Sequence, residues 1–304
     1  MSSSIPGQAM QASISWRDYY VMCKPNVVLL MLLTTLVGML LSTTGMIPLK
    51  ILIVGHLGIG MAAASAAIVN HILDRRIDAQ MSRTQNRPLP QGKVPLANAI
   101  ILAMLLGISG ISMLAVYVNL LTAVLTLAAL FGYAFVYTGF LKRATPQNIV
   151  IGGISGAMPP LLGWVAVTNT FEPNSLLLVL IISVWTPPHF WALAMHKRAE
   201  YDSANIPMLP VTHGLEFTGL QVLLYTILMV LATLLPYVVG MSGLIYLLSA
   251  TLLNLRFLYW AWKLYRADGQ NVAMNTFWYS IIYLALLFIA LLVDHYFLIY
   301  LLPD

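Results

Sequence analysis

Three polar residues recur at intervals of four near the end of a long apolar stretch: Asn70, Asp74 and Asp78. At about 100° per residue, each step of four turns a helix by only about 40°, so a helix here carries all three on one face. Mg²⁺ takes one or two carboxylates in proteins and completes its octahedral coordination with water and phosphate oxygens. Unpaired carboxylates are costly near a membrane. The spacing therefore indicates a site for Mg²⁺ and phosphate, with ion pairing to the flanking arginines as the alternative.

A second cluster of acids beside bases lies at residues 196–202, which read His-Lys-Arg-Ala-Glu-Tyr-Asp. On a helix, Glu200 and Asp202 would point about 200° apart, so we expect only one of them to face a site, and Glu200 is the better candidate. Two acidic clusters with several Lys and Arg nearby suit a metal-bridged diphosphate, because the cations hold the phosphates and the carboxylates hold the metal.

Residues 185–194 read Trp-Thr-Pro-Pro-His-Phe-Trp-Ala-Leu-Ala. Two prolines inside a membrane helix remove backbone donors and bend it, which is tolerated where the helix borders a cavity or packs tightly. His189 follows these prolines between aromatic rings. Both a hydrogen-bonded packing role and a ligand-binding role remain open for it. Five aromatic residues could shelter a carbocation through their π faces, although an interfacial belt is the ordinary explanation: Tyr133, Tyr137, Trp164, Trp185 and Trp191.

The composition indicates that membrane-spanning helices position these residues. Hydrophobic types make up 60% of the 304 residues and charged types only 8%, against roughly 25% charged in soluble domains. This excludes a cytosolic enzyme, a nucleic-acid binder and a secreted disulfide scaffold. A single cysteine, Cys23, excludes an internal disulfide and a thiolate metal cluster. We expect no targeting peptide, because the first 26 residues lack an early apolar core.

Nine stretches are long and apolar enough to cross a bilayer as helices, since a span needs about 20 such residues. They cover about 27–47, 51–72, 94–115, 118–138, 147–168, 175–195, 217–237, 242–262 and 276–300. Continuous apolarity without alternation favours helices over barrel strands.

The basic residues predict the orientation. With the N-terminus inside, fourteen of the fifteen Lys and Arg residues fall in inner segments and only Lys50 falls outside. Short loops enriched in Lys and Arg face the cytoplasm. We therefore expect a cytoplasmic N-terminal segment (1–26), one transmembrane domain (27–304) and an outer C-terminus. Two long cytoplasmic loops, about 73–93 and about 196–216, then share one face.

Several motifs resemble those of the UbiA-type intramembrane prenyltransferase superfamily. The Asn70, Asp74 and Asp78 set, continued by residues 83–90 (Arg-Thr-Gln-Asn-Arg-Pro-Leu-Pro), is similar to its first aspartate-rich motif. Residues 185–194 and 201–211 resemble its haem-modifying branch. The resemblance covers essentially the whole chain. One departure concerns the second motif, which often has two aspartates four apart: Glu200 and Ala204 stand there, so one carboxylate is missing.

The resemblance implies an all-α fold with nine transmembrane helices around a central cavity that opens to the cytoplasm. It also implies transfer of a farnesyl group from farnesyl diphosphate to a vinyl group of haem b, with addition of water, giving haem O and pyrophosphate. The metal Mg²⁺ would lie on Asn70, Asp74, Asp78 and Glu200. Basic side chains would neutralise the departing pyrophosphate: Lys24, Arg83, Lys142 and Arg143. His189, or less favourably His196, would contact the haem iron or a propionate.

The resemblance further implies an active site in the two cytoplasmic loops and contact with the lipid bilayer. We expect a bacterial inner (plasma) membrane, because the chain shows no Arg- and Ser-rich presequence. Haem A synthase or a terminal oxidase would be a partner, and nucleic acid would not.

Two alternatives remain. Another member of the superfamily would prenylate a small aromatic acid or a quinone precursor by the same chemistry, although residues 185–194 argue against this. A secondary transporter would use its carboxylates to carry coupling ions near the bilayer midplane, whereas Asp74, Asp78 and Glu200 all lie near the inner ends of spans.

Overall fold

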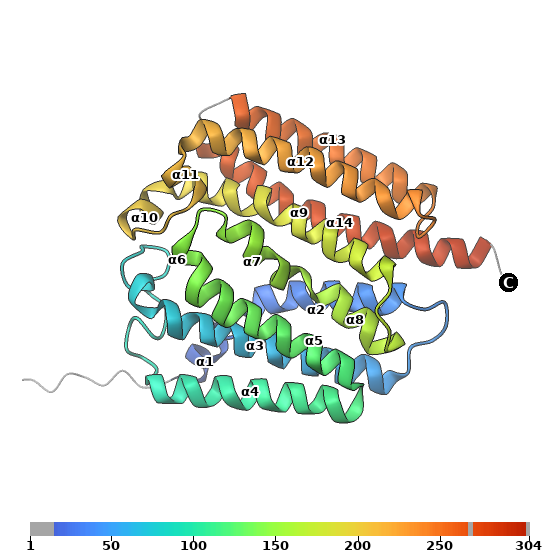
Figure 1. Cartoon of the computed structure of the whole chain (residues 1–304), viewed down its shortest axis with the longest axis horizontal. Coiled ribbons are helices and arrows are strands. Elements are labelled where there is room, and N and C mark those ends of the chain that lie inside the picture. The colour runs from blue at the N-terminus through green and yellow to red at the C-terminus, as the bar shows by residue number, and fades with distance from the viewer. Residues whose placement is uncertain (1–14, 267–269, 302–304) are drawn as a thin grey trace, which may run out of the picture.

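The computed structural model describes residues 15–266 and 270–301. In this part of the chain all regular structure is helical, and the long helices run side by side along the longest axis of the molecule (Figure 1). Within the described residues, eight segments are long and apolar enough to cross a membrane, or nine if the bent pair α1 (Trp16–Met22) and α2 (Pro25–Leu41), at 50° to each other, counts as one. This confirms the predicted all-α, multi-pass membrane architecture.

The remaining helices follow in chain order. The first group comprises α3 (Leu49–Asp78), α4 (Leu96–Tyr117), α5 (Leu120–Phe131), the π-helix η1 (Gly132–Leu141), α6 (Lys142–Ala144), α7 (Asn148–Ala157) and α8 (Pro159–Thr168). The second group comprises α9 (Pro173–His196), α10 (Arg198–Ser203), α11 (Leu209–Thr212), α12 (Gly214–Val238), α13 (Leu244–Arg266) and α14 (Gln270–Leu301). One span combines α5, η1 and α6, and another combines α7 and α8.

Helix α3 is longer than the predicted span 51–72, because it continues to Asp78. Four of the six extra residues are charged, so hydropathy does not include this segment, yet the basic Arg75 and Arg76 in the last turn complement the negative end of the helix dipole. The first predicted loop therefore begins at Ala79 rather than at residue 73. The second, 196–216, contains the short helices α10 and α11.

The first span also differs from its predicted range, 27–47. Helix α2 ends at Leu41, where the Ser42 hydroxyl donates a hydrogen bond to the Met39 carbonyl. In the predicted N-terminal segment 1–26, residues 1–14 lie outside the described part. The remainder contains α1, which begins at a capping box made by Ser15 and Asp18. This segment is thus partly a helix joined to the bundle.

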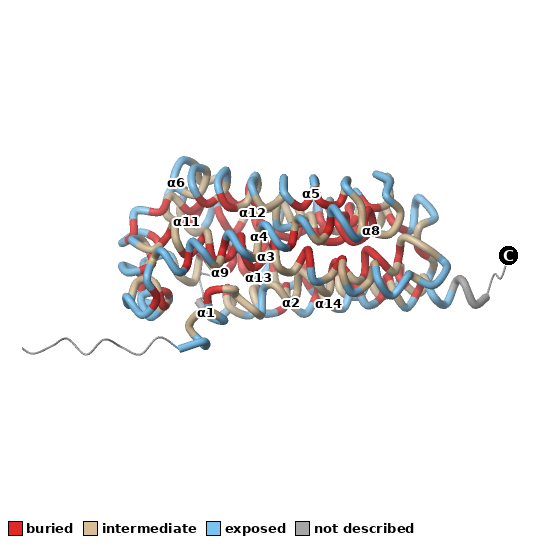
Figure 2. The backbone as a smooth tube through the Cα atoms, turned by 90° about the horizontal axis from the view of Figure 1, so that it is seen from below, coloured by how far each residue is buried: buried red, intermediate tan, exposed pale blue. Residues whose placement is uncertain are grey.

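Helix α9 lies inside the bundle, packed against α7, α12 and α14. It continues as a helix through Pro187 and Pro188. On the other side of the bundle, α3 packs along α4 and also contacts η1. Buried residues line the inner faces of these helices, and exposed residues face outward (Figure 2). The outward faces are apolar, as Ile101, Met104 and Ile108 of α4 illustrate, which suits contact with lipid.

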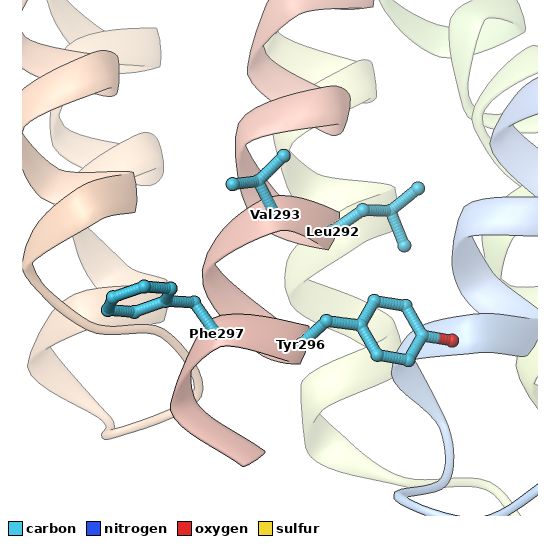
Figure 3. A pocket seen from close by; sticks show the side chains of 4 residues that line it. All are labelled: Leu292, Val293, Tyr296 and Phe297. Atoms are coloured by element: carbon cyan, nitrogen blue, oxygen red, sulfur yellow. The ribbon is translucent and has the colours of Figure 1, made fainter. Parts of the chain in front are cut away.

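The two ends of the bundle differ in character. We call the end that carries α6, α10, α11 and the segment between α3 and α4 the loop end (Figure 1). Near the opposite end, the side chains of Leu292, Val293, Tyr296 and Phe297 line an apolar hollow on α14 (Figure 3). The predicted central cavity that opens to the cytoplasm stays a prediction.

Candidate active site

Asn70, Asp74 and Asp78 all lie in the last three turns of α3 and are buried, as expected for one helix face. Asp74 is only 1% exposed. Its Oδ2 accepts hydrogen bonds from Lys142 Nζ at 2.5 Å and from Asn70 Nδ2 at 2.9 Å. Its Oδ1 has no hydrogen-bond partner, and an Arg143 guanidinium nitrogen lies 3.8 Å away. A buried carboxylate thus keeps one oxygen available while two bases compensate its charge.

Asn70 connects this carboxylate to a second ammonium group. Its Oδ1 accepts a hydrogen bond from Lys24 Nζ at 2.5 Å, and its Nδ2 also donates to Thr138 Oγ1 at 3.2 Å. Lys24 stands at the bend between α1 and α2 with a left-handed backbone, φ 49°. A non-glycine residue in this region is strained and needs support from its surroundings. The bend directs the Lys24 side chain to the end of α3.

Asp78 is held by the segment that follows α3. Its Oδ2 forms an ion pair with Arg87 at 2.7 Å, and its backbone carbonyl accepts a hydrogen bond from the Thr84 hydroxyl at 3.0 Å. Sequence reasoning did not assign Arg87 to the site. The signal for Arg87 in the sequence was its place in residues 83–90, the stretch that continues the aspartate-rich motif.

Glu200 of α10 contacts the same segment, which joins α3 to α4. Lys197 Nζ lies 2.8 Å from Glu200 Oε1. This hydrogen bond lowers the pKa of Glu200, burial opposes the shift, and the Ser82 hydroxyl and the Arg83 backbone N–H lower the pKa further. The next residue, Tyr201, is buried, which raises its pKa, and it interacts with the charge of Arg83. The second acidic cluster therefore meets the first loop at the loop end.

Three histidines occupy different surroundings. His189 is buried between the rings of Trp185 and Phe277, at centroid distances of 4.4 and 4.6 Å, and its Nδ1 lies 2.6 Å from Ser280 Oγ. His196 is the last residue of α9. His71, which sequence reasoning missed, is buried on α3 with no hydrogen-bond partner for either ring nitrogen.

Residues 31–287 match the sequence profile of the UbiA prenyltransferase family. The chain belongs to this family. It is therefore a transferase rather than a secondary transporter.

Two relatives of this UbiA-family chain are identical to it at more than half of the aligned positions. Protoheme IX farnesyltransferase from Shewanella denitrificans is 60% identical over 292 residues, which cover 96% of this chain and 97% of that protein. The protein of the same name from Legionella pneumophila is 57% identical over 289 residues, covering 95% of this chain and 98% of that one.

Solved structures agree on the fold. A structure of digeranylgeranylglyceryl phosphate synthase has a TM-score of 0.78 at 18% identity, covering 92% of this chain and 98% of that one. A UbiA homologue from Archaeoglobus fulgidus bound to DMAPP and Mg²⁺ has a TM-score of 0.64 at 16% identity, covering 90% and 99%.

The residues of the UbiA-family chain suit a hard cation at the end of α3. Within residues 15–266 and 270–301, no three His, Cys, Asp or Glu side chains are grouped to hold one metal ion. Glu200 thus contacts the first loop without completing a three-carboxylate group with Asp74 and Asp78. The carboxylates of Asp74 and Asp78 and the amide oxygen of Asn70 lie on α3, and Oδ1 of Asp74 has no hydrogen-bond partner. That oxygen-only set fits Mg²⁺, which needs only one or two carboxylates when phosphate and water complete its coordination.

Proposed function

We propose that this chain transfers a farnesyl group from farnesyl diphosphate to a vinyl group of haem b, with addition of water, giving haem O and pyrophosphate. The observation that carries the proposal is that relatives matching the chain over almost its full length bear the name protoheme IX farnesyltransferase. The Lys and Arg side chains that contact the end of α3 support the same chemistry, because a departing pyrophosphate needs cations around it.

The reaction breaks the C–O bond between the farnesyl group and the diphosphate, and the electron pair leaves with pyrophosphate. The haem vinyl group supplies two electrons for the new C–C bond. Water then adds to the resulting cation and loses a proton, so the product carries a hydroxyl group.

Lys24, Lys142 and Arg143 bind the diphosphate in this proposal. In the structure the two ammonium groups lie against Asn70 and Asp74, and the guanidinium of Arg143 lies near Asp74. Each is a flexible donor that can turn from an α3 oxygen to a phosphate oxygen. Arg83 approaches from the first loop, whose backbone contacts Glu200. Preplaced cations in a partly dry site lower the energy of the leaving group most as its charge develops.

Mg²⁺ is the proposed cofactor, held by Asn70, Asp74 and Asp78 of α3. Glu200, the fourth residue of the predicted ligand set, lies against the first loop, and its role as a metal ligand stays a prediction. When bound, it would supply further neutralisation of the pyrophosphate charge. The aromatic rings of Tyr133 and Tyr137 stand 5.6 Å apart on η1, the segment that carries the Thr138 contact to Asn70. Their π faces can stabilise the farnesyl cation.

His189 is the proposed haem contact, with His196 as the second candidate. Because Nδ1 of His189 is engaged by Ser280 at 2.6 Å, Nε2 is the nitrogen through which it would reach the haem iron or a propionate. The bilayer suits both substrates, since a fifteen-carbon tail and a porphyrin partition into apolar surroundings.

The proposed location is the bacterial inner membrane, with the loop end and the N-terminus cytoplasmic and the C-terminus outside. The basic residues Lys142, Arg143, Lys197 and Arg198 all lie at the loop end, and positive residues favour the cytoplasmic side. Haem A synthase or a terminal oxidase remains the proposed recipient of the product.

One assay tests the proposal: purified chain, haem b, farnesyl diphosphate and Mg²⁺, with mass spectrometry of the pigment. We expect a mass gain of one farnesyl group plus one water, and no gain when the metal is chelated. A parallel reaction with 4-hydroxybenzoate tests the rival acceptor. Prenylation of that acid with haem b left unchanged would replace the proposal by the small-aromatic alternative.

A further inference from the structure

The segment that faces Asn70 is a π-helix, η1 (Gly132–Leu141). A π-helix bonds each residue to the fifth residue along the chain, so residues five apart lie over one another. In an α-helix the same two positions would point about 140° apart. As a result the Thr138 hydroxyl lies 3.0 Å from the backbone carbonyl of Tyr133, five residues earlier. The π-helix is thus what brings Thr138 to this point.

The direction of the hydrogen bonds at Thr138 follows from simple counting. A hydroxyl has one hydrogen to donate, and a backbone carbonyl can only accept. Thr138 therefore donates its hydrogen to Tyr133. Towards Asn70 Nδ2, 3.2 Å away, the Thr138 oxygen can only accept. Asn70 must then present its NH₂ group to Thr138.

The orientation of the Asn70 amide determines which of its atoms faces Lys24. With NH₂ towards Thr138 and Asp74, the amide oxygen faces Lys24 Nζ at 2.5 Å. A flipped amide would place NH₂ against the Lys24 ammonium group and the amide oxygen against the Asp74 carboxylate. Both contacts would be repulsive.

Asp74 favours the same orientation of the Asn70 amide, but its own interactions change when ligands bind in the proposed site. It also accepts from Lys142 and is itself a proposed ligand of the metal and diphosphate assembly. Thr138 is uncharged, completely buried, and bonded to its own backbone. It can hold the amide while the charges of Lys142 and Asp74 rearrange around a ligand.

We propose that Thr138, placed by the π-helix, is a positioning residue that fixes the Asn70 amide so that its oxygen faces the diphosphate and metal site. This inference rests on the proposed function, because it acts through a residue of that site. It predicts that the loss of one hydroxyl weakens ligand binding without removing a group that touches the substrates.

The test compares Thr138→Val, which keeps the shape and removes the hydroxyl, with Thr138→Ser, which keeps the hydroxyl. Thr126→Val is the matched control: Thr126 is buried in the helix before η1, and its hydroxyl has no hydrogen-bond partner. Two quantities are measured on the full-length chain. The first is the shift in melting temperature produced by farnesyl diphosphate with Mg²⁺ in the absence of haem. The second is the pair of steady-state constants KM and kcat.

In Thr138→Val we expect about five- to tenfold weaker binding of farnesyl diphosphate by both measures, the size of one hydrogen bond. Thr138→Ser and Thr126→Val should stay within about twofold of the wild type by the same criterion. Thr138→Ala also lacks the hydroxyl and should show the same loss of binding. It takes the place of Thr138→Val in the comparison if the valine variant does not fold.

Wild-type binding in both Thr138→Val and Thr138→Ala would overturn the inference, as would a serine variant as weak as the valine variant. Failure of the proposed function is a separate result: the wild-type chain would then leave haem b unmodified, whatever Thr138 does. A variant of Asn70, Asn70→Ala, gives a final check, since adding Thr138→Val to it should weaken ligand binding no further.

Discussion

Lys142 Nζ lies 2.5 Å from Oδ2 of Asp74, although 68 residues separate them along the chain. The Asp74 side chain is 1% exposed and that of Lys142 is 16% exposed. In such surroundings, removing one partner leaves the other charge buried without compensation. The pair therefore connects the end of α3 to α6, directly after η1, and places an ammonium group beside the proposed diphosphate site.

Replacing this ammonium should cost both turnover and stability. We expect Lys142→Met to lower the rate of haem farnesylation at least about 100-fold, the usual scale when one charge-stabilising group is lost. Its melting temperature should also fall. Lys263→Met is the control, because Lys263 lies over the rings of Tyr259 and Trp260 on α13. Equal rates in Lys142→Met and the wild type would refute a role for Lys142 in stabilising the leaving group.

A carboxylate near the opposite end of the bundle should matter for stability alone. Asp294 of α14 is buried and accepts hydrogen bonds from the backbone N–H groups of Gly243 and Tyr246, where α13 begins. Hydrogen bonds to a charged group contribute about 1.5–3 kcal/mol. We expect Asp294→Asn to lower the free energy of unfolding by about this amount, with kcat unchanged in the folded protein. Denaturation and turnover measured on the same preparation check this, and a loss of kcat without a loss of stability would contradict it.

Glu200 should contribute a pH-dependent part of stability. Its pKa is lowered, chiefly by the hydrogen bond from Lys197. A group with a lowered folded-state pKa stabilises the fold above its unfolded pKa, about 4.3 for Glu, and loses that contribution as pH falls through the folded pKa. The stability difference between wild type and Glu200→Gln should thus be constant from pH 5 to 7 and shrink below about pH 4. Melting curves recorded across this pH range test the prediction. A stability difference that grows on acidification would contradict a lowered pKa of Glu200 in the folded state.

The proposed haem contact is open to a direct binding measurement. We expect His189→Ala to lower the affinity for haem b, followed by the absorption spectrum of the bound pigment, because it removes Nε2 from its aromatic surroundings. His213→Ala is a suitable control, since His213 is exposed at the loop end, stacks on Phe217 and has a hydrogen bond with the neighbouring Thr212. If haem binds equally well to both variants, His189 is a packing residue.

Helical periodicity alone was enough to predict part of the site. The four-residue spacing of Asn70, Asp74 and Asp78 predicted one helix face, and all three residues are buried on α3. Crossing parity also predicted that Glu200 and the first loop lie on one side of the membrane, because an even number of spans separates the two loops. Their direct contact comes from the structure. The hydrophobic stretches gave the spans but not their ends, since polar helix turns such as the last turn of α3 lie outside any hydropathy signal.

Other parts of the site depend on tertiary geometry that spacing does not encode. The pairing of Arg87 with Asp78 depends on how the loop folds back. The contact of Thr138 with Asn70 depends on a π-helix, whose hydrogen bonds differ from those of an α-helix by a single residue. The partnerless ring nitrogens of His71 could be found only from the packing around α3.

The central claim is that the acidic face of α3 holds the leaving group. Its most direct measurement is the rate of haem farnesylation by Asp74→Asn, set beside the same substitution at the exposed Asp202 of α10. We predict at least about a 100-fold loss for Asp74→Asn, the usual cost of losing a key charge-stabilising group, and a wild-type rate for Asp202→Asn. Normal turnover of folded Asp74→Asn would contradict the account.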